Sequence, residues 1–373
     1  MSCPGTKPSF LKRLAGAALA VLLTMRCAAE ERPRIIIGVN RPALVSLPEK
    51  QWKATIDKLS AAGVRYLRTT ADPPYERVPA MVRYANDHGI ETVLIIPVWA
   101  QDFYPPGVQP RPGNHRLFAS RPLAQLDIAR FSAFWSEHRK RIREAGARVF
   151  AYQIGNEING AGFNGDYPIS HDAHLLSLPP CDAEAICADV TAGLRTYSEI
   201  LRAVRESGDL GDSLLIAAGM AYTTNRFVRE VGGYFISAAD AVQELDRLGA
   251  GQYIDAYAIH VYPWAPDIGR QAEHDGIQKW MDLAAQECMP PGNGGKPCWI
   301  TEWGIRRTPG SECGFDFKRN RRSLDGLEYI QRSAHKRRLA AAFYFTWDAH
   351  PNFAIENCGE LTIDPALITE PRP

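Results

Sequence analysis

Two glutamates stand in short segments whose residue types suit acid–base and nucleophilic chemistry. The first segment reads GNE and ends at Glu157, and the second reads TEWG and contains Glu302. A pair of carboxyl groups about 5 to 5.5 Å apart can cleave a glycosidic bond with retention of configuration, because one attacks as nucleophile and the other serves as acid and then as base. Each glutamate alone could equally be a surface or ion-paired residue. The pair, with its amide and aromatic neighbours, is what favours this chemistry.

The elements before the two glutamates must bring them together. From Arg34 onward, short β-branched runs alternate with longer amphipathic segments, without a linker, a charge block or a fixed repeat. Eight runs predict strands, at 35–39, 64–69, 92–98, 149–155, 213–218, 254–261, 298–302 and 341–347. The clearest helical patterns cover 49–62, 124–145, 182–207 and 324–339.

This alternation predicts a parallel sheet with crossover helices. An open, doubly wound sheet is disfavoured because no Gly-x-Gly-x-x-Gly follows the first strand and no Walker motif occurs. We therefore predict an α/β fold, a (β/α)8 TIM barrel, as one catalytic domain over residues 30–373. Few residues follow Trp347, and Pro351, Pro365 and Pro371 are among them. The final outer helix is therefore expected to be shortened or replaced.

In a parallel barrel the active site lies where the strands end, on the loops that follow them. Glu157 ends the fourth strand and Glu302 ends the seventh, so both are expected at one rim. Arg68 ends the second strand, and strand periodicity places His260 and Tyr262 on one face of the sixth. Other candidates for sugar contacts end the first, third and eighth strands: Asn40, Trp99 and Trp347.

Each of these candidates also has a purely structural interpretation. A histidine inside a barrel is often a satisfied core group, and an asparagine at a strand end often forms a turn. A tryptophan at such a position is more often part of the packing than a binding surface. For Arg68 the alternative is a surface ion pair, which Arg65, on the opposite face of the same strand, fits better.

The two glutamate segments together resemble glycoside hydrolase clan A, the group that contains cellulases, mannanases and galactanases. The resemblance covers the chain from about Ile35 to Trp347. It implies that Glu157 is the general acid/base and that Glu302 is the nucleophile. It also implies that Asn156 holds the sugar 2-hydroxyl.

By the same resemblance Arg68 and Tyr262 contact the nucleophile, and Trp347 is an aromatic platform for a sugar ring. His260, Trp99 and Asn40 are expected as further substrate contacts. No metal and no organic cofactor are expected, since the sequence contains no Cys-x-x-Cys and no histidine cluster at ligand spacing.

The first 29 residues have the pattern of a signal peptide. Lys7, Lys12 and Arg13 precede an apolar run from Leu14 to Leu23, and the small residues Ala28 and Ala29 follow. The run is about half of the ~20 residues that a membrane-spanning helix needs. We therefore predict export to the periplasm or the medium, without stable insertion in a membrane.

In an oxidising compartment outside the cytoplasm, cysteines are expected to form disulfide bonds. Beyond the signal peptide six remain, an even number that predicts disulfides. Sequence permits many connectivities, and short loops favour pairing between neighbours. The expected bonds are Cys181–Cys187, Cys288–Cys298 and Cys313–Cys358.

The balance of charged residues limits the classes of binding partner to expect. There are 43 basic and 42 acidic side chains, which leaves a formal charge of +1. A nearly balanced charge gives no electrostatic reason to bind a nucleic acid. We expect a monomer that binds an oligosaccharide or a polysaccharide.

The sequence thus predicts a retaining β-glycoside hydrolase that acts within a polysaccharide. Three alternatives remain open. A transglycosylase shares the covalent intermediate, a carbohydrate-binding barrel without activity shares the fold, and a metal-dependent barrel hydrolase would need ligands that the spacing does not offer.

Overall fold

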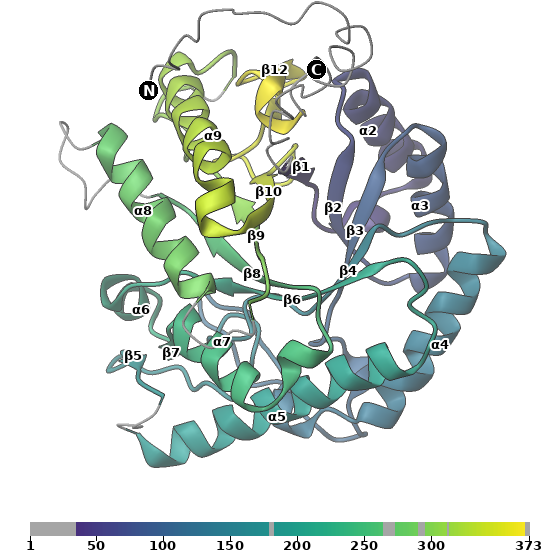
Figure 1. Cartoon of the computed structure of the whole chain (residues 1–373), viewed down its shortest axis with the longest axis vertical. Coiled ribbons are helices and arrows are strands. Elements are labelled where there is room, and N and C mark those ends of the chain that lie inside the picture. Colours follow the sequence, from purple (N-terminus) through teal and green to yellow (C-terminus); the bar gives the residue numbers. More distant parts are fainter. Residues whose placement is uncertain (1–34, 179–182, 264–272, 290–294, 312, 370–373) are drawn as a thin grey trace, which may run out of the picture. The chain divides into compact units, whose positions relative to one another are not determined.

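The computed structural model describes residues 35–178, 183–263, 273–289, 295–311 and 313–369. Its centre is a closed barrel of eight parallel strands, in the order β1-β10-β9-β8-β6-β4-β3-β2 (Figure 1). All eight predicted strands are present. They are β1 Ile36–Asn40, β2 Tyr66–Thr70, β3 Glu91–Ile96, β4 Ala151–Ile154, β6 Leu214–Ala221, β8 Ala256–Val261, β9 Cys298–Trp303 and β10 Leu339–Phe345.

Helices follow the barrel strands and surround them (Figure 1). In the described residues they are α2 Glu49–Ala61, α3 Val78–Asp87, α4 Ile128–Glu144, α5 Glu184–Glu206, α6 Asn225–Val231, α7 Ala238–Arg247, α8 Glu273–Cys288 and α9 Phe317–Arg337. The sequence explains α4 well: Asp127 accepts hydrogen bonds from two backbone N–H groups of the first turn, and Phe131, Trp135 and Ile142 recur on one buried face. The predicted (β/α)8 barrel in a single domain is confirmed.

The last unit of the barrel departs from the ideal fold as predicted. Among the described residues after β10 there is no α-helix, and a two-stranded sheet takes its place, formed by β11 (Glu356–Asn357) and β12 (Glu360–Leu361). A single 3-10 helix, Pro365–Ile368, then packs near β1, β10 and α9. A second small sheet pairs β5 (Leu175–Leu176) with β7 (Phe235–Ile236).

The barrel interior changes from apolar to polar along its axis. Trp299 and Phe343 fill the apolar part, with ring centroids 6.1 Å apart and nearly parallel planes. Polar side chains follow two positions after the apolar ones on the same strand. On β9 Thr301 follows Trp299, and on β4 Gln153 follows Ala151. Because side chains alternate with period two, these polar groups point into the same lumen, towards the carboxyl ends of the strands.

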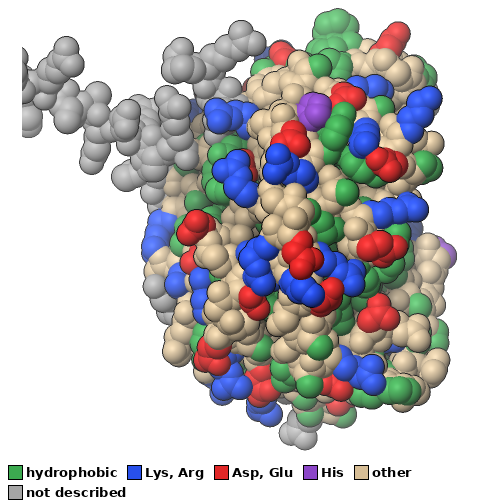
Figure 2. All heavy atoms as spheres, turned by 90° about the vertical axis from the view of Figure 1, so that its right-hand side faces the viewer, with side chains coloured by type: hydrophobic (Ala, Val, Ile, Leu, Met, Phe, Trp, Pro, Cys, Tyr) green, Lys and Arg blue, Asp and Glu red, His purple; other side chains and the backbone are tan. Residues whose placement is uncertain are grey.

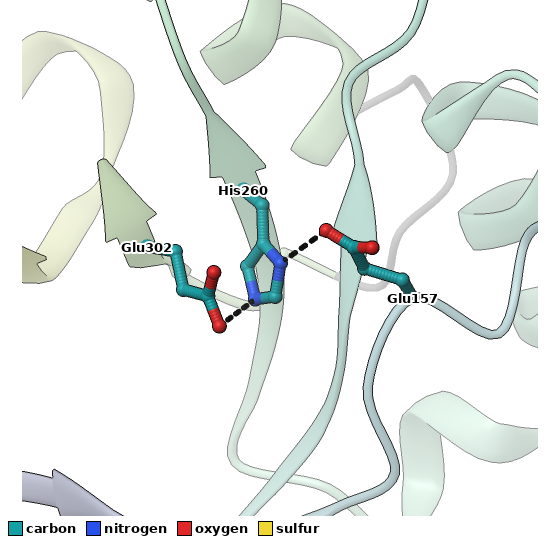
Figure 3. Close-up of side chains that lie close together, drawn as sticks. All are labelled: Glu157, His260 and Glu302. Carbon is teal, nitrogen blue, oxygen red and sulfur yellow. Dashed lines mark hydrogen bonds and ion pairs between the residues drawn. The ribbon is translucent and has the colours of Figure 1, made fainter. Parts of the chain in front are cut away.

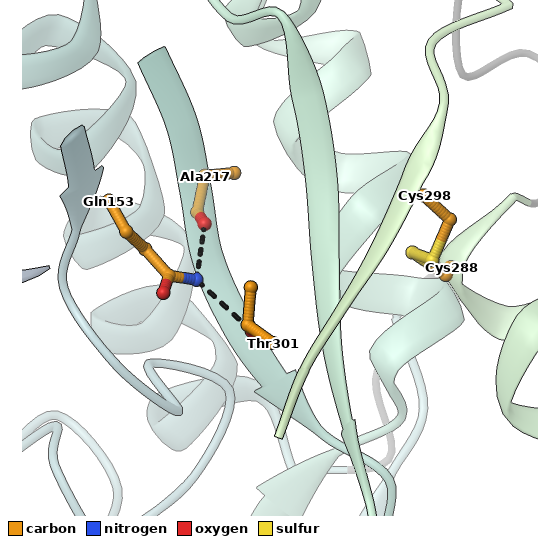
Figure 4. The surroundings of a disulfide bond; sticks show 5 residues. All are labelled: Gln153, Ala217, Cys288, Cys298 and Thr301. Atoms are coloured by element: carbon orange, nitrogen blue, oxygen red, sulfur yellow. Dashed lines mark hydrogen bonds between the residues drawn. A yellow bond between two sulfur atoms is a disulfide. The ribbon is translucent and has the colours of Figure 1, made fainter. Parts of the chain in front are cut away.

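Two disulfides lie within the described residues, and both join the predicted neighbours. Cys288–Cys298 ties the end of α8 to the start of β9, with a Cα–Cα distance of 5.9 Å (Figure 4). Cys313–Cys358 joins the loop after β9 to the turn between β11 and β12. Cys181 lies outside the described residues, so its bond with Cys187 stays a prediction.

The predicted signal peptide also lies outside the described residues. In the part of the chain that the structure describes, no helix is long and apolar enough to cross a membrane.

On the face that carries α3 and α4, lysines and arginines alternate with acidic side chains, and neither sign gathers into a patch (Figure 2). Pairs such as Arg83 with Asp87 and Arg141 with Glu137 account for part of this mixing.

Candidate active site

The turn after β4 presents Glu157 through an unusual backbone. Gly155 and Glu157 both have positive φ, at 79° and 43°, and only the glycine adopts this region without steric cost. The Glu157 N–H donates to the carbonyl of Gly219 on β6 at 2.8 Å, which fixes the turn. Strain at a single residue that the surroundings hold in place is typical of functional sites.

Glu302, near the end of β9, is almost enclosed by donors. Arg68 Nη1 donates to Oε1 at 2.6 Å, and the Tyr262 hydroxyl donates to Oε2. Burial by itself would raise the pKa of Glu302. The electrostatic effects of His260 and Arg68, together with the hydrogen bonds from Tyr262 and Arg68, outweigh burial and lower that pKa below its ordinary value. Glu302 is therefore held as a carboxylate.

His260 lies between the two glutamates (Figure 3). Its Nδ1 is 2.8 Å from Oε1 of Glu157, and its Nε2 is 3.6 Å from Oε1 of Glu302. The imidazole is 1% exposed, so both contacts are shielded from bulk water. Oxygens of the two carboxylates lie within 4.8 Å of each other. The three side chains come from loops and strands that are distant in sequence, and the barrel alone brings them together.

Arg68 organises the polar layer beneath the glutamates. Its guanidinium is fully buried and donates to Asn40 Oδ1 at 2.7 Å, to Gln153 Oε1 at 2.6 Å and to Asn156 Oδ1 at 3.0 Å. Among these acceptors and Glu302, only Glu302 carries a charge. The buried cation is thus directed at one carboxylate while neutral amides hold its geometry.

Two of the residues predicted to contact a substrate are buried in this structure. Asn40 is fully buried: its amide donates to the Thr301 carbonyl at 2.9 Å and its oxygen accepts from Arg68, so both polar atoms have partners inside the protein. Trp347 is 2% exposed and belongs to the buried hydrophobic core, so its ring does not face solvent. Asn40 orients Arg68, and Trp347 contributes to packing.

Other predicted residues do reach the rim, meaning the carboxyl ends of the strands and the loops that follow. Asn156 is 7% exposed and directly precedes Glu157. Trp99 is partly exposed, and its ring centroid lies 5.0 Å from that of Phe163. Tyr262 is partly exposed beside Phe345, whose ring is nearly perpendicular at 5.8 Å. These residues remain candidates for contact with a substrate.

Three further residues near the glutamates are not among those predicted from the sequence. Gln153 positions Arg68 and also donates to the Ala217 carbonyl at 3.0 Å (Figure 4). Phe345 is partly exposed and its ring contacts that of Tyr262, and Gly219 leaves room for the His260 ring. A glutamine between two apolar residues of a predicted barrel strand was a usable signal for Gln153. Neither of the other two carried one.

Glu157, His260 and Glu302 are also the side chains that could hold a metal ion, within the residues that the structure describes. The arrangement does not suit one ion. His260 turns different ring nitrogens towards the two carboxylates, so an ion bound to all three side chains would have to replace at least one of these contacts. Arg68 Nη2 also lies 3.4 Å from Nε2 of His260, and its charge would repel a cation.

Comparisons with known proteins agree with the fold. No family model and no curated protein matches the sequence. Among solved structures, an endo-β-1,4-mannanase from Thermotoga petrophila is similar with a TM-score of 0.50 and 10% identity, over 91% of this chain and 76% of that one. The AHE enzyme from Alicyclobacillus herbarius has a TM-score of 0.53 and 12% identity, over 89% and 96%.

An exo-β-1,4-mannosidase from Opitutaceae bacterium strain TAV5 is similar with a TM-score of 0.53 and 15% identity, over 90% of this chain and 57% of that one. At such identities the likeness concerns the fold. The chain therefore has the barrel that its resemblance to clan A implies.

Proposed function

We propose that this chain is a retaining β-glycoside hydrolase of clan A type, with Glu302 as nucleophile and Glu157 as acid/base. One observation carries the proposal: oxygens of the two carboxylates lie within 4.8 Å of each other. Retaining enzymes place the two carboxyl groups about 5 to 5.5 Å apart, whereas inverting enzymes need about 6.5 to 9.5 Å to admit a water. The spacing supports direct attack by a glutamate on the sugar.

The surroundings of each glutamate support its role. Glu302 must be ionised to attack the anomeric carbon, and the Arg68 and Tyr262 contacts favour the ionised form. Glu157 has a side chain that is 24% exposed, so it can reach the leaving oxygen to donate a proton and later accept one from water. His260 contacts both carboxylates, so its hydrogen bonds can adjust when a proton moves to or from Glu157.

The proposed substrate is a polysaccharide that is cleaved within the chain, outside the cytoplasm. The disulfides Cys288–Cys298 and Cys313–Cys358 support an oxidising compartment. We propose a monomer that needs no metal or organic cofactor, because side chains alone supply the acid, the base and the nucleophile.

The test is hydrolysis of 4-nitrophenyl β-glycosides of glucose, mannose, galactose and xylose, with the first-formed anomer assigned by NMR. We expect hydrolysis with retention, unchanged in the presence of EDTA. Glu302→Gln keeps the shape of the side chain and removes the nucleophile, so it serves as the inactive control. An inverted first product, or activity that EDTA abolishes and a divalent metal restores, would contradict the proposal.

A further inference from the structure

Three aromatic rings form a continuous row on the loops that follow β3 and β4, and Glu157 lies near the start of the second of these loops. The Trp99 and Phe163 centroids are 5.0 Å apart, and those of Phe163 and Phe118 are 5.6 Å apart. Phe118 is 67% exposed, and the other two are partly exposed. A single exposed aromatic ring is ordinary on a protein surface. A row that runs from the end of a barrel strand to solvent needs another explanation.

The loops that carry the row hold it in place. In the loop after β3, Arg111 and Ser120 exchange backbone hydrogen bonds at 2.8 and 3.1 Å, which forms a hairpin around Phe118. The Ser120 hydroxyl donates to the Gly162 carbonyl at 2.9 Å, and the Arg111 guanidinium donates to the carbonyl of Ala161. The hairpin is thereby fastened to the backbone just before Phe163. The relative position of Phe118 and Phe163 is therefore fixed by hydrogen bonds to the backbone as well as by their ring contact.

The row lies on the side of the site that belongs to the acid/base. Trp99 follows β3 and Phe163 follows Glu157 on the loop after β4, and β3 and β4 are neighbours that pair as far as Ile96 and Ile154. Glu302 comes from β9, which β8 and β6 separate from β4. Glu157 donates its proton to the oxygen of the leaving group, so the leaving group departs on its side.

We propose that Trp99, Phe163 and Phe118 form a platform for the sugars of the leaving group. Pyranose rings present an apolar C–H face that packs on aromatic rings, and successive rings in the row are separated by distances comparable to one sugar. The substrate is then a chain that continues past the cleaved bond, and the enzyme cuts within it. This inference rests on the proposed function, because the proton donor defines the leaving side.

The experiment compares two substrates with the same sugar at the cleaved bond. One is the 4-nitrophenyl β-glycoside that the wild type hydrolyses, and the other is a tetra- to hexasaccharide of that sugar. The variants Phe118→Ala and Phe118→Ala/Phe163→Ala should lower the ratio of oligosaccharide to aryl-glycoside kcat/KM by about fivefold for each ring removed, mainly through KM. Trp99→Ala should lower it further, and Trp99→Phe should restore part of it.

Phe317→Ala is the matched control. Phe317 is 78% exposed and lies at the start of α9, where its ring contacts Phe315 rather than the row. This variant should leave the ratio unchanged. The proposal is overturned if the ratio is the same in the row variants and the wild type, or if Phe317→Ala lowers it equally.

Failure of the proposed function gives a different result. If the wild type cleaves none of the glycosides, binding of the same oligosaccharides to the wild type is measured by calorimetry. Weaker binding by Phe118→Ala/Phe163→Ala would then support the platform in a barrel without hydrolytic activity. Equal affinity in the two proteins would overturn it.

Discussion

Gly219 and His260 are in such close contact that a side chain at position 219 would displace the imidazole. A Cβ atom on Gly219 would lie 2.1 Å from Nε2 of His260 and 2.7 Å from Oγ1 of Thr301. The carbonyl of the same glycine accepts from the N–H of Glu157. One residue of β6 therefore sets the positions of both the histidine and the acid/base.

Replacing this glycine should impair the reaction without unfolding the barrel. Gly219→Ala should push His260 away from both glutamates and lower kcat/KM by about 100-fold, as displacements of about 1 Å in a catalytic group do. Steady-state kinetics and circular dichroism measure the two effects. With the 4-nitrophenyl glycoside as substrate, Gly162→Ala is the matched control, since a Cβ there meets nothing within 4 Å and the backbone carbonyl that accepts from Ser120 is kept. Wild-type activity in Gly219→Ala would show that the His260 position is not critical.

The two glutamates should fail in different steps when each is replaced. Glu302→Ala should form no glycosyl-enzyme with any leaving group, and azide in the vacated space should give a product of inverted configuration. Glu157→Ala should still react with an activated aryl glycoside and accumulate the intermediate, and azide should give a product of retained configuration. Burst kinetics, mass spectrometry and NMR of the product distinguish them. A trapped sugar on any residue other than Glu302 would refute the assignment.

The hydrogen bond from Tyr262 should be visible in the pH profile. Activity requires ionised Glu302, so kcat/KM falls as the pH drops through the pKa of this carboxyl, which Arg68, His260 and Tyr262 lower. Tyr262→Phe removes one of these causes, so the pKa should rise and the acidic limb should move to higher pH. At the optimum we expect a loss of about 100-fold. Tyr84→Phe, which removes a hydroxyl bound to Asp57 on the outer helices, should leave the limb in place.

The bond between Cys313 and Cys358 should contribute to stability rather than to chemistry. It spans a sequence separation of 45 residues, and both residues are exposed, so their replacement leaves no cavity. Cys313→Ala/Cys358→Ala should lower the free energy of unfolding by about 2–4 kcal/mol because the unfolded chain gains freedom. Denaturant unfolding measures this. The single variant Cys313→Ala should lose the same amount of unfolding free energy. An unchanged denaturation midpoint in both variants would show that the bond does not stabilise the fold.

The barrel could be predicted because its signals are local. Strand runs, helical periodicity and the absence of nucleotide-binding motifs depend on neighbours in the chain, and the eight strands appear where these patterns place them. The rule that active sites lie at the carboxyl ends of parallel strands then placed Glu157 and Glu302 at one rim. Period-two alternation likewise separated the buried Arg68 from the exposed Arg65.

The solvent exposure of the predicted site residues, and the distances between them, depend on the tertiary structure. Asn40 and Trp347 end strands just as Trp99 does, yet both are buried, because segments far away in the sequence cover them: Asn40 meets Thr301 and Arg68, and the Trp347 backbone bonds Asn40. Gly219 and Gln153 matter only through groups on other strands. The local sequence predicts which face of a strand a side chain lies on and how far along the strand it is. What packs over it depends on contacts between distant segments, and those exist only once the barrel closes.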